Sequence, residues 1–153
     1  MPGAPTWASR KAGEDAPVYN PPVSSQATPP RAATRVPALS FFFPAHNEAE
    51  NIEPLVREAL GALSAMAEQF EIIAVDDGSR DATPEIADRL AAEHLSVRVV
   101  HHPTNRGYGA ALRSGLAAAR YPLVAFLDGD RQFRVADLVR LLNAPDREGT
   151  TSL

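Results

Sequence analysis

The sequence predicts an α/β fold in which a parallel sheet is flanked by helices. Short apolar runs alternate with helical patterns four times along the chain, and each run ends in polar residues. Right-handed crossovers between such strands give a parallel sheet with helices on both faces. The length of 153 residues suits one domain at most.

Composition excludes several classes of protein. There is no cysteine, so disulfides and thiolate metal sites are excluded. A net charge of −4 gives no reason to expect nucleic acid as a partner. No apolar run approaches the roughly 20 residues that a membrane helix needs, and the N-terminus lacks the pattern of a secretory signal. We therefore expect a soluble chain without a transmembrane segment, which is compatible with a cytoplasmic location.

Residues 1–37 are expected to form a disordered, proline-rich N-terminal arm. They hold 8 of the 14 prolines, and such a composition cannot bury enough apolar surface to offset the entropy cost of ordering. A polyproline ligand for a docking domain is the alternative to a flexible tail.

The first strand is predicted at Leu39–Phe43, an aromatic-rich run that suits burial on both faces. A helix follows the polar turn after it. Asn47 and Glu50 suggest a capping pair, but Pro54 favours a helix start nearer Asn51, because proline is tolerated only in the first turn. The apolar stripe of this helix consists of Ile52, Leu55, Val56, Ala59, Leu60 and Leu63.

The second strand is predicted at Phe70–Val75, and the acidic turn Asp76-Asp77-Gly78-Ser79 follows it. Thr83 is then expected to cap a helix that has Pro84 at its first position. The buried stripe of this second helix consists of Ile86, Ala87, Leu90 and Ala91.

The third helix is rich in alanine and other small residues, which would let it lie close to a sheet. Leu112 and Leu116 are spaced one turn apart on it. The remaining elements are predicted as a strand at 97–100, a loop at 105–109, this helix at 110–119, a strand at 123–127 and a helix at 135–142.

Four loops lie at the carboxyl ends of the predicted strands, which is where ligands bind to sheets of this kind. They are residues 44–48, 76–79, 105–109 and 128–130. If the first and fourth strands are neighbours, the first, second and fourth loops converge on one nucleotide-type site.

The acidic pair Asp128 and Asp130 follows the fourth strand directly. The two carboxylates lie on the same side of a tight turn, since alternate residues of an extended chain point the same way. Oxygen ligands favour Mg²⁺ or Mn²⁺, and Mg²⁺ commonly bridges carboxylates to substrate phosphates. Alternatively, the two acids cap the helix that begins near Val135 or lie in a solvated loop.

The other polar loops are ambiguous when each is taken alone. Asp76 and Asp77 could accept hydrogen bonds from a base or a ribose, or form an ordinary turn before a helix. The loop 105–109 could approach a phosphate through its backbone amides. The histidines form no convincing metal set, His101 and His102 are expected to be structural or solvent-facing, and no Ser-His-Asp grouping stands out.

Four segments together carry a family resemblance: Phe43–Ile52, Val75–Asp81, Asn105–Gly107 and Asp128–Gln132. In their order and spacing they resemble a family 2 glycosyltransferase, and most of all the dolichyl- or polyprenyl-phosphate sugar transferases. The resemblance implies a Rossmann-like GT-A fold, a UDP- or GDP-sugar donor, a divalent metal, and inverting transfer of the sugar. It further implies a polyprenyl-phosphate acceptor and a peripheral location at the cytosolic membrane face.

The resemblance also implies roles for single residues. Those that would line the nucleotide sugar are Pro44, His46, Glu48, Val75, Asp77, Asp128, Gly129 and Gln132, with Val75 and Asp77 on the base side. Those that would hold the metal are Asp128 and Asp130. His46 departs from the family pattern, because a tyrosine is usual at its position.

The resemblance implies a donor-binding half at residues 38–143, followed by an irregular tail at 144–153. The family's domain continues beyond this length, and its acceptor site and general base are not among these residues. We therefore expect no catalytic residue here, and a truncated, inactive, C-terminally incomplete fragment. The alternative is a module that binds a nucleotide or metal without catalysis. Phosphatase and receiver-like domains are disfavoured, because Lys11, the only lysine, lies in the arm.

Overall fold

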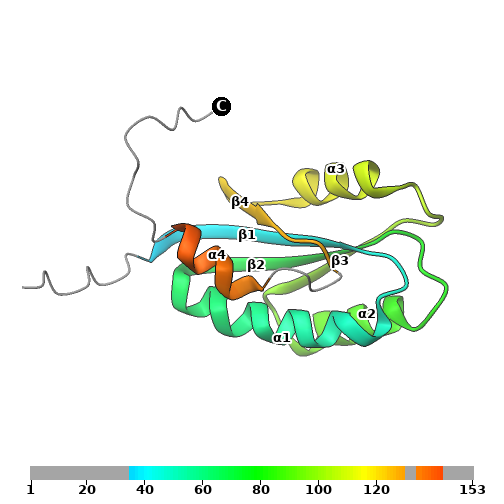
Figure 1. The fold of residues 1–153 in the computed structure, drawn as a ribbon, viewed down its shortest axis with the longest axis horizontal. Helices are drawn as coiled ribbons and strands as arrows, with labels where there is room; N and C mark the ends of the chain where they lie inside the picture. Colours follow the sequence, from blue (N-terminus) through cyan, green and yellow to red (C-terminus); the bar gives the residue numbers. More distant parts are fainter. Residues whose placement is uncertain (1–34, 130–133, 143–153) are drawn as a thin grey trace, which may run out of the picture. The chain divides into compact units, whose positions relative to one another are not determined.

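The computed structural model describes residues 35–129 and 134–142. Its centre is a sheet of four parallel strands in the order β3-β2-β1-β4 (Figure 1). The predicted α/β sheet is thus confirmed. The first strand lies beside the fourth, which is the condition under which the first, second and fourth loops converge. The elements are β1 (Val36–Ala45), α1 (Ala49–Met66), β2 (Ala67–Asp76), α2 (Thr83–Glu93), β3 (Val97–His101), α3 (Tyr108–Ala118), β4 (Leu123–Phe126) and α4 (Val135–Leu142).

Helices cover both faces of the sheet, with α1, α2 and α4 on one face and α3 on the other (Figure 1). Side chains alternate along β1, so Phe41 and Phe43 join the larger core with α1, while Phe42 joins a smaller core with Ala111 of α3. All three phenylalanines are fully buried. The consecutive phenylalanines therefore mark a strand that is buried on both faces.

The first strand begins earlier than predicted. β1 starts at Val36, which lies opposite Ala67 in the pairing with β2. The guanidinium of Arg35 donates to the carbonyls of Ser64 at 2.9 Å and Ala67 at 2.6 Å. Residues 35–37, which were predicted to belong to the arm, are therefore part of the folded domain.

Some predictions fall outside the described residues. These are the rest of the arm, the tail at 144–153, and the site residues Asp130 and Gln132. Within the described ranges, no helix is long and apolar enough to cross a membrane.

The first helix begins at Ala49, so the predicted start near Asn51 is wrong. Pro54 lies inside this helix and cannot donate to the carbonyl of Glu50. Glu50 is exposed, and water can therefore replace the missing donor. The proline is tolerated here because it stands on the solvent side.

The predicted caps, Asn47 for α1 and Thr83 for α2, are also wrong, since neither helix has a side-chain hydrogen bond from its own cap residue. Instead, the amide of Glu48 donates to Oγ1 of Thr83 at 2.9 Å, and the amide of Ala49 donates to Oδ2 of Asp81 at 3.2 Å. Oδ1 of Asp81 accepts from the amide of Thr83 at 2.9 Å. One loop thus caps both helices.

The third helix packs mainly on small residues, with Leu112 partly buried beside them and Leu116 turned away. Leu116 is 54% exposed, whereas Ala111 and Gly115 are buried. A Cβ placed on Gly115 would lie only 2.2 Å from Cδ2 of Phe42. The close approach expected from small residues is confirmed, and the face of the helix that makes it is the one opposite to Leu116.

Candidate functional site

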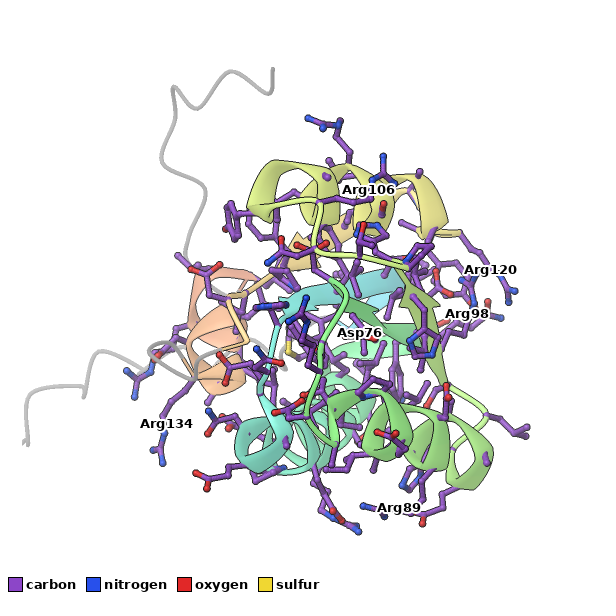
Figure 2. The ribbon with its side chains drawn as sticks, turned by 90° about the vertical axis from the view of Figure 1, so that its right-hand side faces the viewer. Asp76, Arg89, Arg98, Arg106, Arg120 and Arg134 are labelled. Atoms are coloured by element: carbon purple, nitrogen blue, oxygen red, sulfur yellow. The ribbon has the colours of Figure 1, made fainter. Side chains whose placement is uncertain are left out.

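A cavity of about 440 Å³ lies at the carboxyl ends of the strands. This volume falls in the usual range for small-molecule sites. The lining residues are Pro44, Ala45, His46, Glu48, Asp77, Asn105, Gly107, Tyr108, Ala111, Asp128 and Gly129. The cavity therefore brings together six of the predicted site residues, from the end of β1 and from the loops that follow β1, β2 and β4. Figure 2 looks onto this end of the sheet, with Asp76 near the centre and Arg106 towards α3.

The close approach of the Asp128 loop to β1 requires a glycine. A Cβ on Gly129 would lie 2.5 Å from the carbonyl oxygen of Pro44, which is much closer than atoms normally pack. Because Gly129 has no side chain, the loop can lie directly against the end of β1. Asp128 is thereby placed in the same cavity as the residues of the first loop.

Asp77 lines the cavity, but its carboxylate is largely engaged within the protein. Oδ1 accepts from the amide of Arg106 at 2.8 Å and from Nδ1 of His102 at 2.7 Å, and Oδ2 accepts from the amide of Gly107 at 2.9 Å. Burial would raise the pKa of Asp77, but these three hydrogen bonds outweigh it and hold the pKa below its ordinary value. The carboxylate organises the loop 105–107 in addition to forming part of the wall.

Val75, predicted on the base-binding wall, is fully buried and does not line the cavity. Its side chain packs in the smaller core with Phe42 and Ala111. Val75 therefore supports the site through core packing and does not form part of the cavity wall.

His46 lines the cavity and has a defined orientation. Its Nδ1 donates to the carbonyl oxygen of Asp77 at 2.8 Å, so Nε2 is the acceptor in the neutral ring. The side-chain amides of Asn47 and Asn105 lie 3.3 Å from Nε2. The imidazole thus joins the loops that follow β1, β2 and β3.

Two further polar contacts shape the cavity. The hydroxyl of Tyr108 donates to Oδ1 of Asp128 at 2.7 Å, across the space between the start of α3 and the end of β4. Oε2 of Glu48 accepts from the side-chain amide of Asn51 at 2.7 Å. Tyr108 was not predicted as a site residue. The sequence pointed to it only through the loop 105–109, which could approach a phosphate.

Asp76, His101 and His102 make hydrogen bonds within the protein. Oδ1 of Asp76 accepts from the amide of Ser79 at 3.0 Å. His101 bridges Asp76 and Asp88 at 2.9 and 2.8 Å, and these two partners raise the pKa of the imidazole. The predicted structural role of His101 and His102 is confirmed. No Ser-His-Asp grouping stands out in the sequence, but the fold forms one, because His102 contacts both Asp77 and Ser114.

The described residues satisfy only part of the requirement for a metal site. Asp128 offers carboxylate oxygen, the ligand type that Mg²⁺ and Mn²⁺ prefer, at the cavity wall. Within residues 35–129 and 134–142, no group of three or more His, Asp or Glu side chains is arranged to hold an ion. The second predicted ligand, Asp130, lies outside these ranges.

Comparison with known proteins identifies the family. Residues 40–152 match the family described as Glycosyl transferase family 2. The chain is 42% identical over 104 residues to glycosyltransferase AglD of Haloferax volcanii, covering 66% of this chain and 17% of that protein. It is 36% identical over 110 residues to dodecaprenyl-phosphate galacturonate synthase of Rhizobium johnstonii, covering 71% of this chain and 32% of that protein.

Solved structures agree with this assignment. The fold matches the mannosyltransferase PcManGT from Pyrobaculum calidifontis, solved with GDP-Man and Mn²⁺, with a TM-score of 0.59 and 25% identity over 72% of this chain and 33% of that one. It also matches S. aureus TarS 1-349 in complex with UDP, with a TM-score of 0.53 and 26% identity over 61% of this chain and 27% of that one. The chain thus spans about a third or less of the proteins it matches. It belongs to the family 2 glycosyltransferases and has their GT-A fold.

Proposed function

We propose that this chain binds the nucleotide-sugar donor of a glycosyltransferase that transfers a sugar to polyprenyl phosphate. The observation that carries the proposal is the cavity in which Pro44, His46, Glu48, Asp77, Asp128 and Gly129 meet. Ligands of doubly wound sheets bind at this edge, beyond the carboxyl ends of the strands. The relatives support the acceptor class, since one of them is named a dodecaprenyl-phosphate galacturonate synthase.

The donor class follows from the cavity wall and from the structural neighbours. Backbone and side-chain groups of the first loop, including Pro44 and His46, offer contacts to a base and a ribose. Asp128 and Gly129 lie beside this loop at the end of β4, and the diphosphate would lie next to them. The neighbours were solved with UDP and with GDP-Man, so a UDP- or GDP-sugar is the proposed donor.

A divalent cation, Mg²⁺ or Mn²⁺, would be held by Asp128 together with Asp130. When bound, the ion would stabilise the negative charge that develops on the nucleoside diphosphate as it leaves. Gln132 would lie beside the donor phosphates. We further propose that transfer inverts the anomeric configuration, and that the enzyme works peripherally at the cytosolic face of a membrane, where a lipid phosphate is accessible.

Isothermal titration calorimetry of the full chain tests the donor site. The titrants are UDP, GDP, UDP-glucose and GDP-mannose, each with and without Mn²⁺. We expect at least one pair of nucleotide and sugar nucleotide to bind in the presence of Mn²⁺. Asp128→Asn and Asp130→Asn should each weaken this binding by about tenfold or more, which is about 1.4 kcal/mol or more, because each removes a carboxylate that would bind the cation.

Glu85→Gln provides the matched control, since it removes one carboxylate from an exposed position on α2. If no nucleotide binds to the wild type, the proposed donor site is wrong. If Asp130→Asn binds nucleotide as tightly as the wild type, with or without Mn²⁺, the metal role of Asp130 is wrong.

A further inference from the structure

Three side chains from different elements form a continuous hydrogen-bonded line beside the cavity. Ser114 of α3 lies with its Oγ 2.7 Å from Nε2 of His102, and Nδ1 of His102 lies 2.7 Å from Oδ1 of Asp77. His102 is only 6% exposed. A buried imidazole with partners at both nitrogens is fixed in orientation.

This Ser-His-Asp line does not have the properties of a nucleophilic triad. Ser114 does not line the cavity, so no substrate in the cavity would meet its hydroxyl. Asp77 is also not reserved for the histidine, because its two oxygens hold backbone amides as well. The line is therefore suited to holding parts of the protein in place.

The part that it holds is the loop before α3. Asp77 accepts from the consecutive amides of Arg106 and Gly107, and Gly107 has a φ of +93° that few other residues adopt. α3 begins at the next residue, Tyr108. The hydroxyl of Tyr108 in turn donates to Oδ1 of Asp128. A path of short contacts therefore runs from His102 to a carboxylate of the candidate site.

We propose that Ser114, His102 and Asp77 form a positioning relay that fixes the loop 105–107, so that Tyr108 holds the Asp128 carboxylate in place for the donor diphosphate. Tyr108 and His102 are positioning residues here, because they act through Asp128 and Asp77. The inference rests on the proposed donor site for its ligand. The relay itself is a property of the chain without ligand.

The relay has a specific chemical requirement at position 102. Asp77 needs an N–H donor at the place of Nδ1, and the side-chain amide of asparagine carries one at the same distance along the side chain. His102→Asn therefore keeps the bond to Asp77 and loses the bond to Ser114. His102→Leu fills similar space and loses both bonds.

Calorimetry with UDP or GDP in the presence of Mn²⁺ measures the coupling. We expect Tyr108→Phe and His102→Leu each to weaken binding by about tenfold, as for one hydrogen bond to a charged group. The double variant should be no weaker than the weaker single variant, because both act through Asp128. His102→Asn should recover most of the affinity lost in His102→Leu, and His101→Leu, the matched change at the neighbouring histidine, should leave the affinity unchanged.

Amide hydrogen exchange tests the relay without any ligand. The amides of Arg106 and Gly107 should exchange faster in His102→Leu than in the wild type, while Tyr108→Phe leaves them protected. If His102→Leu fails to fold, Ser114→Ala replaces it and should produce a smaller change in the same direction. Additive losses in the double variant, or wild-type protection of both amides in the relay variants, would overturn the inference. If the wild type binds no nucleotide, the proposed function fails, and the exchange result alone decides whether the relay holds the loop.

Discussion

Replacing Gly115 by alanine should destabilise the fold through one specific contact. The new Cβ would lie 2.2 Å from Cδ2 of Phe42, whereas carbon atoms normally pack about 3.5–4.0 Å apart, so the helix or the ring must move by about 1.3 Å or more. The ring cannot easily retreat, because it is fully buried and stacks on Phe126 with centroids 5.3 Å apart. Overpacking of this kind costs about 1–3 kcal/mol.

Gly61→Ala is the matched control. Gly61 is exposed on α1, and nothing lies within 4 Å of a Cβ placed there. Both replacements gain about 1 kcal/mol of helix propensity, so the difference between them isolates the contact with Phe42. Urea unfolding followed by circular dichroism should place the midpoint of Gly115→Ala about 0.5–3 M below that of Gly61→Ala, for a cost of about 1–3 kcal/mol and a slope of about 1–2 kcal/mol per M. Coincident midpoints would refute the claim that this contact requires glycine.

Three further predictions concern stability. Asp81→Ala should lower the free energy of unfolding by about 1–2 kcal/mol, because Asp81 caps two helices; a thermal melt checks this, and an equal loss in the exposed control Glu85→Ala would argue against it. The pKa of His101 is raised in the folded protein. Its contribution to the free energy of unfolding is therefore fully present below about pH 6.5 and is lost as the pH rises through the pKa of the folded state. Because the ring is partly exposed, this loss of stability should be at most about 1 kcal/mol. Urea midpoints measured across pH 6–9 should fall in the wild type and not in His101→Gln. Glu71→Gln should cost about 2–3 kcal/mol by urea unfolding, because the buried carboxylate pairs with Arg98 at 2.7 Å and also accepts from Ser40 and the amide of Arg120; a wild-type midpoint would contradict this.

The sequence predicts the order of elements well because each strand is a compact apolar run. It predicts the ends of the elements less well, because pairing between distant segments sets them. β1 extends back to Val36 since Ala67 lies opposite it in β2, and no local pattern shows this. α1 starts at Ala49 because Asp81, 32 positions away, accepts from its amide. A local capping rule cannot find a cap of this kind.

The third helix shows why helical spacing alone can mislead. Leu112 and Leu116 have the right spacing for a buried stripe, but Leu116 is more than half exposed. The buried face carries Ala111 and Gly115, because the Phe42 ring fills the space that larger side chains would need. The strand that the helix packs against decides which of its two faces is buried. The sequence of the helix alone does not reveal that strand.

Some residues of the candidate site can be identified from the sequence and others cannot. The motifs identify residues such as Asp77 and Asp128, because they follow buried strands whose carboxyl ends meet at one edge. They do not identify His102 or Tyr108, since the bonds of these residues join positions 25 and 20 apart in the sequence. Residues that act by holding others are defined by three-dimensional contacts, and a motif does not record them.

The first wall of the cavity is the loop after β1, and the second consists of Asp128 and Gly129. The hydrogen bonds of the described residues hold these two walls differently. On the first wall, the amide of Asn47 donates to Oγ of Ser79 at 3.0 Å, and the amide of Arg80 donates to Oδ1 of Asn47 at 2.9 Å. These bonds hold Asn47 at a φ of 53°, a left-handed conformation that asparagine tolerates better than most residues. On the second wall, the carboxylate of Asp128 accepts one side-chain hydrogen bond from the described residues, that of Tyr108. Among the described residues, Tyr108 is thus the side chain that holds Asp128, whereas two bonds between backbone amides and side chains join the loops after β1 and β2. Loss of the Tyr108 hydroxyl should therefore loosen Asp128 and leave the loops after β1 and β2 in place.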